Sequence, residues 1–356
     1  MKNNTKKYVI SGIGPGSCGV GRLMNSFKPR YKLLGYKVIH KRNQNSLKEF
    51  LNQNKYFSFL KEIFLRKIFN WIFLVRLHQI NGCEIILIHP QTVGYKASIR
   101  LIKKNLVTLY VMDNSFFCIQ SYNYNSNTKM ECLKCISKID PDKECNSYPQ
   151  FGNKKEAIEY LLMLKKYSEK ITFYSQNKIQ KDLLEMHFGN KINIKIIGMS
   201  QSNITLHKNI NLENRIFSYK KFDIVYHGSL HPAKGIYYFI NLAKYLPELS
   251  FLVPEEFDKL KAIFNNNLPK NIYCFKMTWE TGLKEFVVNA KLVVNPSLWS
   301  APIEGALIKS AEHNDNVATV ISKFGFEAEF KGIKNHLRLD NDVLIASRQI
   351  LYFLNK

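Results

Sequence analysis

Short apolar runs alternate with segments of helical periodicity along most of this chain. Runs that suit the strands of a buried parallel sheet are residues 8–11, 37–39, 84–88, 106–111, 171–175 and 192–197 in the first half. A second set lies at 222–226, 249–253, 271–276, 292–294 and 317–321. Alternation of this kind predicts an α/β protein with parallel sheets.

A polar, Asn- and Lys-rich stretch at 200–221 separates the two sets of strands. With 356 residues the chain is long enough for two domains. We expect an N-terminal domain over 1–200 with a Cys-rich insertion at about 114–150, and a C-terminal domain over 201–356. The last helix, around 343–354, is a candidate to pack back on the N-terminal domain.

The charge balance indicates an anionic partner. The chain has 52 Lys and Arg against 28 Asp and Glu, a formal charge of +24. A nucleotide, a nucleic acid, an anionic membrane face and an acidic glycan all fit such a surplus. Because the aromatic residues are not interleaved with basic ones as in RNA-binding motifs, we do not expect nucleic acid. The N-terminus lacks the pattern of a signal peptide, so we expect a cytoplasmic protein.

The most apolar segment, 57–77, contains too many charges to span a bilayer. Its apolar residues fall at helical spacing, at Leu60, Phe64, Ile68, Trp71, Ile72 and Val75. Lys61, Arg66 and Lys67 lie mostly elsewhere on the helical wheel. The pattern is that of a helix packed on a domain core or of a basic amphipathic helix on the inner face of a membrane.

Three loops that follow predicted strands carry the residues suited to phosphate chemistry. The first spans 11–22 and includes Gly14 and Gly16, which would let the backbone approach a ligand closely before a helix N-terminus. The second, 227–235, includes Ser229 and places Lys234 where it can neutralise a diphosphate. The third, 295–312, has a Pro-Ser start before a helix.

These loops, in this order and in two α/β halves, resemble the GT-B glycosyltransferases of the family-4 type. The resemblance covers most of the chain and is strongest over 222–321, where Gly228-Ser229-Leu230, Lys234-Gly235, Pro296-Ser297 and the glutamate-containing helix recur in the family's order. It implies two Rossmann-like domains that face a central cleft. It also implies a nucleotide-sugar donor, a retaining outcome and no metal in the chemical step.

The resemblance also implies roles for particular residues. Lys234, Gly305 and Ala306, with Ser229, would hold the donor diphosphate, and Glu304 would bind the sugar. Gly14 and Gly16 would close over the donor. Glu304 and Glu312 have the seven-residue separation of the family's acidic pair, but a second register places Lys309 at the later acidic position.

Two departures from the family pattern bear on the site. Ser229 stands where the family often has a phosphate-binding arginine, and the family's His-Asp pair is Met112-Asp113 in this chain. Asp113 is therefore our candidate for positioning the acceptor. His89, at the end of another strand, is a candidate to replace the missing histidine.

Four cysteines lie close together in the predicted insertion, at Cys118, Cys132, Cys135 and Cys145. Four thiolates with a Cys-x2-Cys pair suit a tetrahedral structural zinc site, and a disulfide is not expected in the cytoplasm. Ordinary buried thiols are the alternative.

The sequence thus predicts an enzyme that moves a sugar from a UDP- or GDP-type donor to a glycan or lipid-linked acceptor in surface polysaccharide synthesis. Two other interpretations remain. One is a GT-B sugar-nucleotide epimerase or hydrolase, and the other is a basic binding protein without catalysis.

Overall fold

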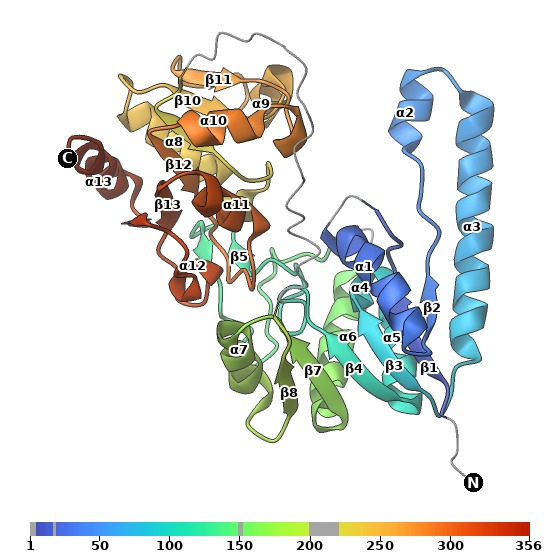
Figure 1. The fold of residues 1–356 in the computed structure, drawn as a ribbon. Helices are drawn as coiled ribbons and strands as arrows, with labels where there is room; N and C mark the ends of the chain where they lie inside the picture. The colour runs from blue at the N-terminus through green and yellow to red at the C-terminus, as the bar shows by residue number, and fades with distance from the viewer. Residues whose placement is uncertain (1–4, 17–18, 149–151, 199–220) are drawn as a thin grey trace. The chain divides into compact units, whose positions relative to one another are not determined.

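The computed structural model describes residues 5–16, 19–148, 152–198 and 221–356. Two compact units divide the chain (Figure 1). The first comprises Met1–Ser121 and Lys134–Thr205, and the second comprises Tyr122–Leu133 and Leu206–Lys356. Each unit is built on a six-stranded parallel sheet, which confirms the predicted α/β class.

The sheet of the first unit has the strand order β2-β1-β3-β4-β7-β8. Its strands are β1 (Lys7–Ser11), β2 (Lys37–His40), β3 (Glu84–Ile88), β4 (Leu106–Tyr110), β7 (Ile171–Ser175) and β8 (Asn193–Ile196). The helices of this unit are α1 (Gly19–Leu33), α2 (Leu47–Asn52), α3 (Tyr56–His78), α4 (Pro90–Val93), α5 (Tyr95–Lys104), α6 (Lys154–Lys166) and α7 (Lys178–Phe188).

The sheet of the second unit has the order β11-β10-β9-β12-β13-β14. Its strands are β9 (Ile224–Tyr226), β10 (Phe251–Val253), β11 (Ile272–Cys274), β12 (Leu292–Asn295), β13 (Asn316–Val320) and β14 (Asn335–Leu339). The helices are α8 (Ile236–Tyr245), α9 (Phe257–Ile263), α10 (Leu283–Asn289), α11 (Gly305–His313), α12 (Phe326–Glu329) and α13 (Val343–Leu354).

The central strands are buried on both faces, as their uninterrupted apolar sequences predict. All three residues of β9 are fully buried, and those of β12 are nearly so. Helix α13 packs on α8 and joins the core on one face of this sheet. Because every strand pair in the two sheets is parallel, the loops after the strands of one sheet gather at one edge.

A short hairpin from the first half of the sequence belongs to the second unit. Strands β5 (Tyr124–Asn125) and β6 (Met130–Glu131) form this hairpin, which the sequence predicts to lie inside an N-terminal insertion. The Asn123 side chain donates to the Ser300 hydroxyl at 2.7 Å and accepts from the Ser300 amide at 3.0 Å. These hydrogen bonds join residues far apart in the sequence, so the local sequence pattern could not predict them. They attach the hairpin to the second unit.

Glu131 completes the attachment of the hairpin. Its carboxylate accepts hydrogen bonds from the hydroxyls of Ser300 and Ser322 and from the amides of Lys323 and Phe324. These four donors, from the loops after β12 and β13, form a specific binding site for one carboxylate.

No helix among the described residues is both long enough and apolar enough to pass through a bilayer.

Candidate functional site

A pocket opens where the loops after β9 and β12 meet at the carboxyl edge of the second sheet. Its empty volume is about 410 Å³. Parallel α/β sheets bind ligands at this edge. We call it the β9–β12 pocket, and it is lined by His227, Gly228, Ser229, Lys234, Asn295, Ser297, Ile303, Glu304, Gly305 and Ala306. Among the residues that the sequence predicts for the site, it gathers Ser229, Lys234, Glu304, Gly305 and Ala306.

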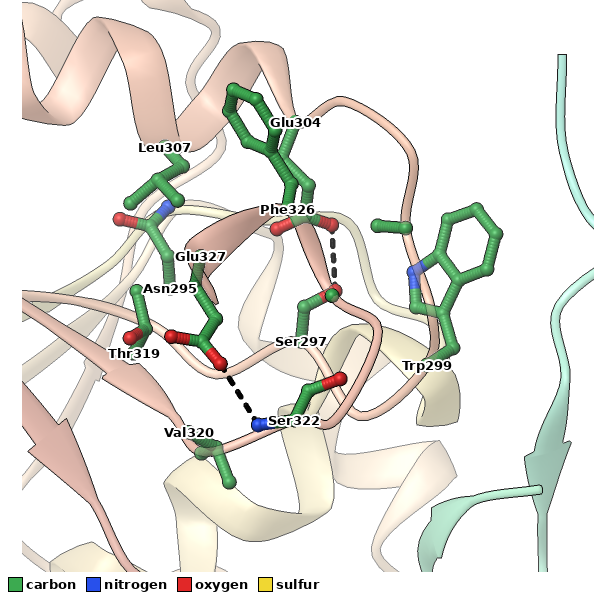
Figure 2. Close-up of a pocket in the computed structure, with 12 residues that line it drawn as sticks. Asn295, Ser297, Trp299, Glu304, Leu307, Thr319, Val320, Ser322, Phe326 and Glu327 are labelled. Atoms are coloured by element: carbon green, nitrogen blue, oxygen red, sulfur yellow. Dashed lines mark hydrogen bonds between the residues drawn. The ribbon is translucent and has the colours of Figure 1, made fainter. Parts of the chain in front are cut away.

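Lys234 and Glu304 form an ion pair in this pocket. Lys234 ends the short 3-10 helix η4 (Pro232–Lys234), and Glu304 immediately precedes α11. The Ser297 hydroxyl donates to the same carboxylate at 2.6 Å, as Figure 2 shows. The Lys234 ammonium also lies 4.8 Å from the centre of the Trp299 ring. The cation is therefore held in place by a carboxylate and an aromatic ring.

The N-terminus of α11 is a second source of positive potential. The first amides of a helix have no acceptor within the helix, and the helix dipole adds positive charge at that end. Glu304 precedes the helix without forming a side-chain cap on it. Gly305 and Ala306, the first residues of α11, line the pocket. A phosphate group placed here would meet backbone donors and Lys234 together.

The loop between β9 and α8 is shaped by one buried tyrosine and one glycine. The Tyr226 hydroxyl lies 2.7 Å from the carbonyl oxygen of Ser229 and 3.1 Å from that of Lys234, so one side chain holds both ends of the loop. Gly235 has a φ of 77°, and a Cβ there would lie 1.8 Å from the carbonyl oxygen of Pro296. Only glycine lets the two loops approach this closely.

His227 stands at the inner end of the pocket in its neutral form. Its Nδ1 lies 2.8 Å from the Ser310 hydroxyl, and its ring stacks on Trp279 with 5.2 Å between ring centres. Burial, together with the nearby Lys309 and His313, lowers the pKa of His227 to about 3. Sequence reasoning misses His227, although its place directly after a buried strand is a usable signal.

A smaller pocket of about 240 Å³ adjoins the first and shares Asn295, Ser297 and Glu304 with it (Figure 2). Its far side is built by Glu327, which accepts from the Ser322 amide at 2.9 Å and pairs with Arg338. The two pockets place Glu304 between a positive region and a region rich in hydroxyl and carboxylate groups.

The two alternatives for the later acidic position have different surroundings. Glu312 is exposed near the end of α11 and is not among the residues that line the β9–β12 pocket. Lys309 is half-buried, with its ammonium 5.0 Å from the centre of the Trp279 ring. Of the predicted acidic pair, Glu304 alone lies in this pocket.

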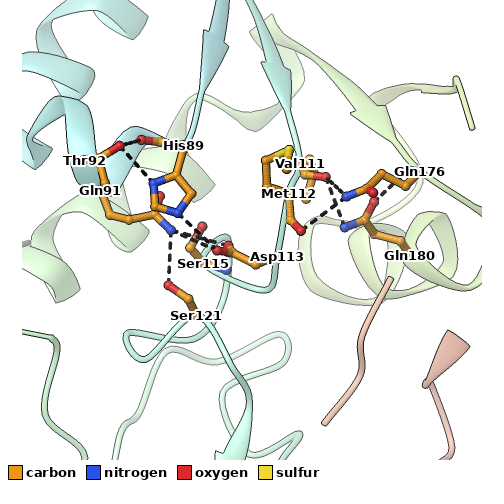
Figure 3. A network of polar contacts seen from close by, with 10 residues as sticks. All are labelled: His89, Gln91, Thr92, Val111, Met112, Asp113, Ser115, Ser121, Gln176 and Gln180. Carbon is orange, nitrogen blue, oxygen red and sulfur yellow. Dashed lines mark hydrogen bonds and ion pairs between the residues drawn. The ribbon is translucent and has the colours of Figure 1, made fainter. Parts of the chain in front are cut away.

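In the first unit, Asp113 is the centre of a buried polar network (Figure 3). Its carboxylate accepts from the Gln91 side chain at 3.1 Å and from the Ser115 amide at 2.9 Å. The Nε2 atom of His89 lies 3.6 Å from the same carboxylate. The structure thus brings together Asp113 and His89, the two residues that the sequence offers for the acceptor side.

His89 has two features that are unusual for a structural histidine. Its φ is 52°, in the left-handed region that non-glycine residues seldom adopt. Burial lowers its pKa, and the Asp113 charge opposes this effect only in part. The side chain of Thr92 lies 2.9 Å from Nδ1. A neutral imidazole fixed between a hydroxyl and a carboxylate is suited to accept or pass on a proton.

Gly14 and Gly16 lie in the loop between β1 and α1 of the first unit. A Cβ on Gly14 would lie 2.7 Å from side-chain atoms of both Asn43 and His40, so a larger residue there would require these side chains to shift. The Asn43 side chain also donates to the carbonyl oxygen of Pro15 at 2.6 Å. That Gly14 and Gly16 let the backbone approach a donor closely remains a prediction.

The four cysteines of the predicted zinc site are divided between the units. Cys132 lies in the hairpin segment of the second unit, whereas Cys118, Cys135 and Cys145 belong to the first. Across the described ranges, no group of three His, Cys, Asp or Glu side chains is arranged to hold a metal ion. The structural zinc site remains a prediction.

Comparison with solved structures finds proteins of similar fold. No family model matches this sequence, and no curated protein matches it either. Sucrose-phosphate synthase from Thermosynechococcus elongatus superimposes with a TM-score of 0.55 at 10% identity, over 99% of this chain and 90% of that one. The UDP-forming α,α-trehalose-phosphate synthase from Burkholderia vietnamiensis gives 0.52 at 11% identity, over 98% and 91%.

HepE from Anabaena, solved in complex with UDP and glucose, gives a TM-score of 0.51 at 14% identity, over 99% of this chain and 90% of HepE. Each likeness extends over nearly the whole of both chains. At such low identity the likeness concerns the fold, and the chain has the two-unit GT-B fold of these proteins, as the sequence predicts.

Proposed function

We propose that this protein is a glycosyltransferase that takes a sugar from a nucleoside diphosphate donor bound in the β9–β12 pocket. The observation that carries the proposal is the convergence of Lys234, the uncapped start of α11 and the Ser229 loop on one pocket. A diphosphate is the ligand that fits a cation beside a row of backbone amides. HepE, of the same fold, was solved with UDP.

The proposed chemistry rests on stabilising the leaving group. As the bond between the sugar and the diphosphate breaks, negative charge grows on the diphosphate. Lys234 and the amides of Gly305 and Ala306 would oppose that charge from fixed positions. Glu304 would accept hydrogen bonds from sugar hydroxyls, since its carboxylate lies beside the second pocket. In the proposal the residues perform this step without a metal ion.

The acceptor would be positioned by the network around Asp113. The Asp113 carboxylate and the neutral His89 imidazole provide a proton acceptor and a hydrogen-bond partner for a hydroxyl group. The retaining outcome, the glycan or lipid-linked acceptor and the role in surface polysaccharide synthesis are parts of this proposal.

The first test measures thermal stabilisation of the full chain by UDP-, GDP- and CMP-sugars, by free nucleotides and by a short RNA. A ligand that binds only the folded state raises the unfolding free energy by about 2.7 kcal/mol at a hundredfold excess over Kd. We expect one nucleotide class to stabilise the wild type. Lys234→Ala should lose most of this effect because it removes the cation from the diphosphate site.

Lys284→Ala is the matched control, since Lys284 is an exposed lysine of the same unit outside the pocket. Glu304→Gln should bind the nucleotide alone at least as strongly as the wild type, because the carboxylate that competes for Lys234 is gone, and it should lose the additional stabilisation from the sugar. If no nucleotide stabilises the wild type, or if Lys234→Ala is stabilised as strongly as the wild type, the proposed donor site is wrong. Release of free sugar or an epimer without an acceptor would instead identify a hydrolase or epimerase.

A further inference from the structure

Helix α3 differs from the other helices of the first unit because both of its faces carry large apolar side chains. One face packs on the unit and buries Phe73 and Leu77. The sequence stripe that includes Leu60, Phe64 and Trp71 lies on the opposite side. On a helical wheel of 100° per residue, these positions are about 120–160° from the middle of the packed face. The helix therefore has a packed face and an exposed apolar face.

The packed face is fixed by a buried carboxylate. Glu62 is 3% exposed, and its side chain forms ion pairs with Arg42 at 3.1 Å and Arg66 at 3.3 Å. The Lys41 ammonium lies 5.5 Å from the centre of the Phe73 ring. These contacts tie α3 to the segment after β2 and determine which side of the helix faces outward.

The exposed apolar face of α3 consists of several large side chains on one side of the helix, not of isolated surface residues. Its largest members are Phe57, 81% exposed, Trp71, 66% exposed, and Leu60 and Phe64, each 64% exposed. Val75 continues the same stripe one turn beyond Trp71. We call these five residues the α3 stripe. Helix α3 is the long helix at the β2 side of the first unit in Figure 1. A continuous apolar patch of this kind marks an interaction site.

The charges beside the α3 stripe indicate what covers it. Lys61 and Lys67 are exposed on its two sides, and Lys55 and Arg76 are exposed near its ends. The one acidic residue of α3 is Glu62, which is buried on the packed face. The outer side of α3 is thus apolar and cationic, and it suits an anionic surface with an apolar interior.

A second copy of this chain fits the α3 stripe less well. Pairing two stripes would bring Lys61 and Lys67 of each copy close together, and α3 has no outward acid to balance them. An anionic bilayer instead offers phosphate groups to the lysines and acyl chains to Phe57, Leu60 and Phe64. Trp71 is suited to the boundary between these two regions.

We propose that the protein docks on anionic membranes through the α3 stripe, with α3 lying in the plane of the headgroups. A helix of 23 residues is about 35 Å long, which gives an extended contact along the membrane surface. Its charged residues make it too polar to cross the bilayer. This inference does not depend on the proposed transferase activity, because it concerns a surface of the first unit. It assigns the lipid surface itself as the partner.

The test uses the full chain and vesicles of phosphatidylcholine with or without an equal share of phosphatidylglycerol. We expect flotation with the anionic vesicles, with at least tenfold weaker partitioning to the neutral ones. Changing Leu60, Phe64 and Trp71 together to Ser should reduce partitioning at least tenfold. Folding should be preserved, since all three side chains are exposed. Lys61→Glu with Lys67→Glu should reduce binding to the anionic vesicles alone.

The matched control changes Leu162, Tyr245 and Tyr352 to Ser, which are similarly exposed apolar residues outside α3. This control should bind like the wild type.

A blue shift of tryptophan emission on anionic vesicles that disappears in Trp71→Phe would place the stripe itself in the bilayer. The proposal is overturned if the α3 triple variant floats like the wild type. It is also overturned if the wild type stays in solution with both vesicles or forms a dimer that the triple variant abolishes.

Discussion

At the scale of single residues, the central feature of the β9–β12 pocket is the positive charge of Lys234, which the carboxylate of Glu304 neutralises. Lys234 pairs with Glu304 and lies over Trp299. Under the proposed function, an entering diphosphate would compete with Glu304 for this ammonium group. Glu304 would then turn to the sugar, and this one ion pair would couple the binding of the two halves of the donor.

The buried His187 provides a prediction about pH. Its side chain is 2% exposed, and its Nδ1 accepts from the Ser137 amide at 3.1 Å. Burial, with the nearby Lys165, lowers its pKa to about 4. Between pH 6.5 and 4 the unfolded chain therefore binds a proton at this residue that the folded chain does not. The contribution of His187 to stability is fully present above pH 6.5 and falls as the pH decreases.

Because of His187, the free energy of unfolding should be about 2 kcal/mol lower at pH 5 than at pH 7. His187→Asn keeps an acceptor near Nδ1 and removes the titration. Urea unfolding at pH 7 and pH 5 should then show a smaller loss of stability in this variant than in the wild type. The exposed His78→Asn serves as the control. Parallel pH profiles for wild type and His187→Asn would contradict the assignment.

At the scale of elements, the pocket depends on the close approach of two loops at Gly235. A Cβ at this position would overlap the Pro296 carbonyl, and the backbone has a positive φ. Gly235→Ala should therefore lower the unfolding free energy by more than about 2 kcal/mol, because strain and overlap act together. Denaturant unfolding measures this change directly.

Substitutions at two other glycines of the same unit distinguish the effect of backbone strain from the effect of steric overlap. Gly282 has a φ of 134°, and a Cβ there would meet open space, so Gly282→Ala should cost backbone strain alone. Gly305 has open space and an ordinary φ, so Gly305→Ala should leave stability almost unchanged. Equal losses in Gly235→Ala and Gly282→Ala would show that the Pro296 contact is unimportant.

The elements that could be predicted from sequence are those with a local cause. The apolar runs at 84–88 and 292–294 match β3 and β12 within one residue, since a buried strand needs little beyond its own sequence. Strand β14 escapes prediction because Asn335–Leu339 mixes polar and apolar residues at a sheet edge. Glu304 could be named because the loop at 295–312 resembles a family motif. The contact of His89 with Asp113 could not be predicted from sequence, because it depends on how two separate loops fold.

At the scale of the whole molecule, the two compact units do not follow the order of the chain. The segment 122–133 supplies Asn123 and Glu131 to the loops after β12 and β13. A fragment of 206–356 alone would leave these donors and acceptors without their partners. Each buried hydrogen bond lost in this way costs about 1 kcal/mol.

We therefore expect 206–356 alone to unfold at a lower temperature than the same fragment preceded by 122–133 on a Gly-Ser linker. Differential scanning calorimetry of the two proteins makes the comparison. Glu131→Gln in the linked protein should remove part of the gain, because the amide nitrogen cannot accept from the Lys323 amide and the negative charge that strengthens the other hydrogen bonds is lost. Equal melting temperatures for the two fragments would mean that the hairpin adds no stability to its unit.

The position of this hairpin also has a consequence for biosynthesis. The ribosome completes residues 122–133 well before it reaches β14, the last strand of the sheet to which they belong. At about 5–20 residues per second, the intervening stretch of roughly 200 residues takes some 10–40 s to translate. During that interval the hairpin has no docking site, so the nascent chain must keep it unattached until the second sheet has formed.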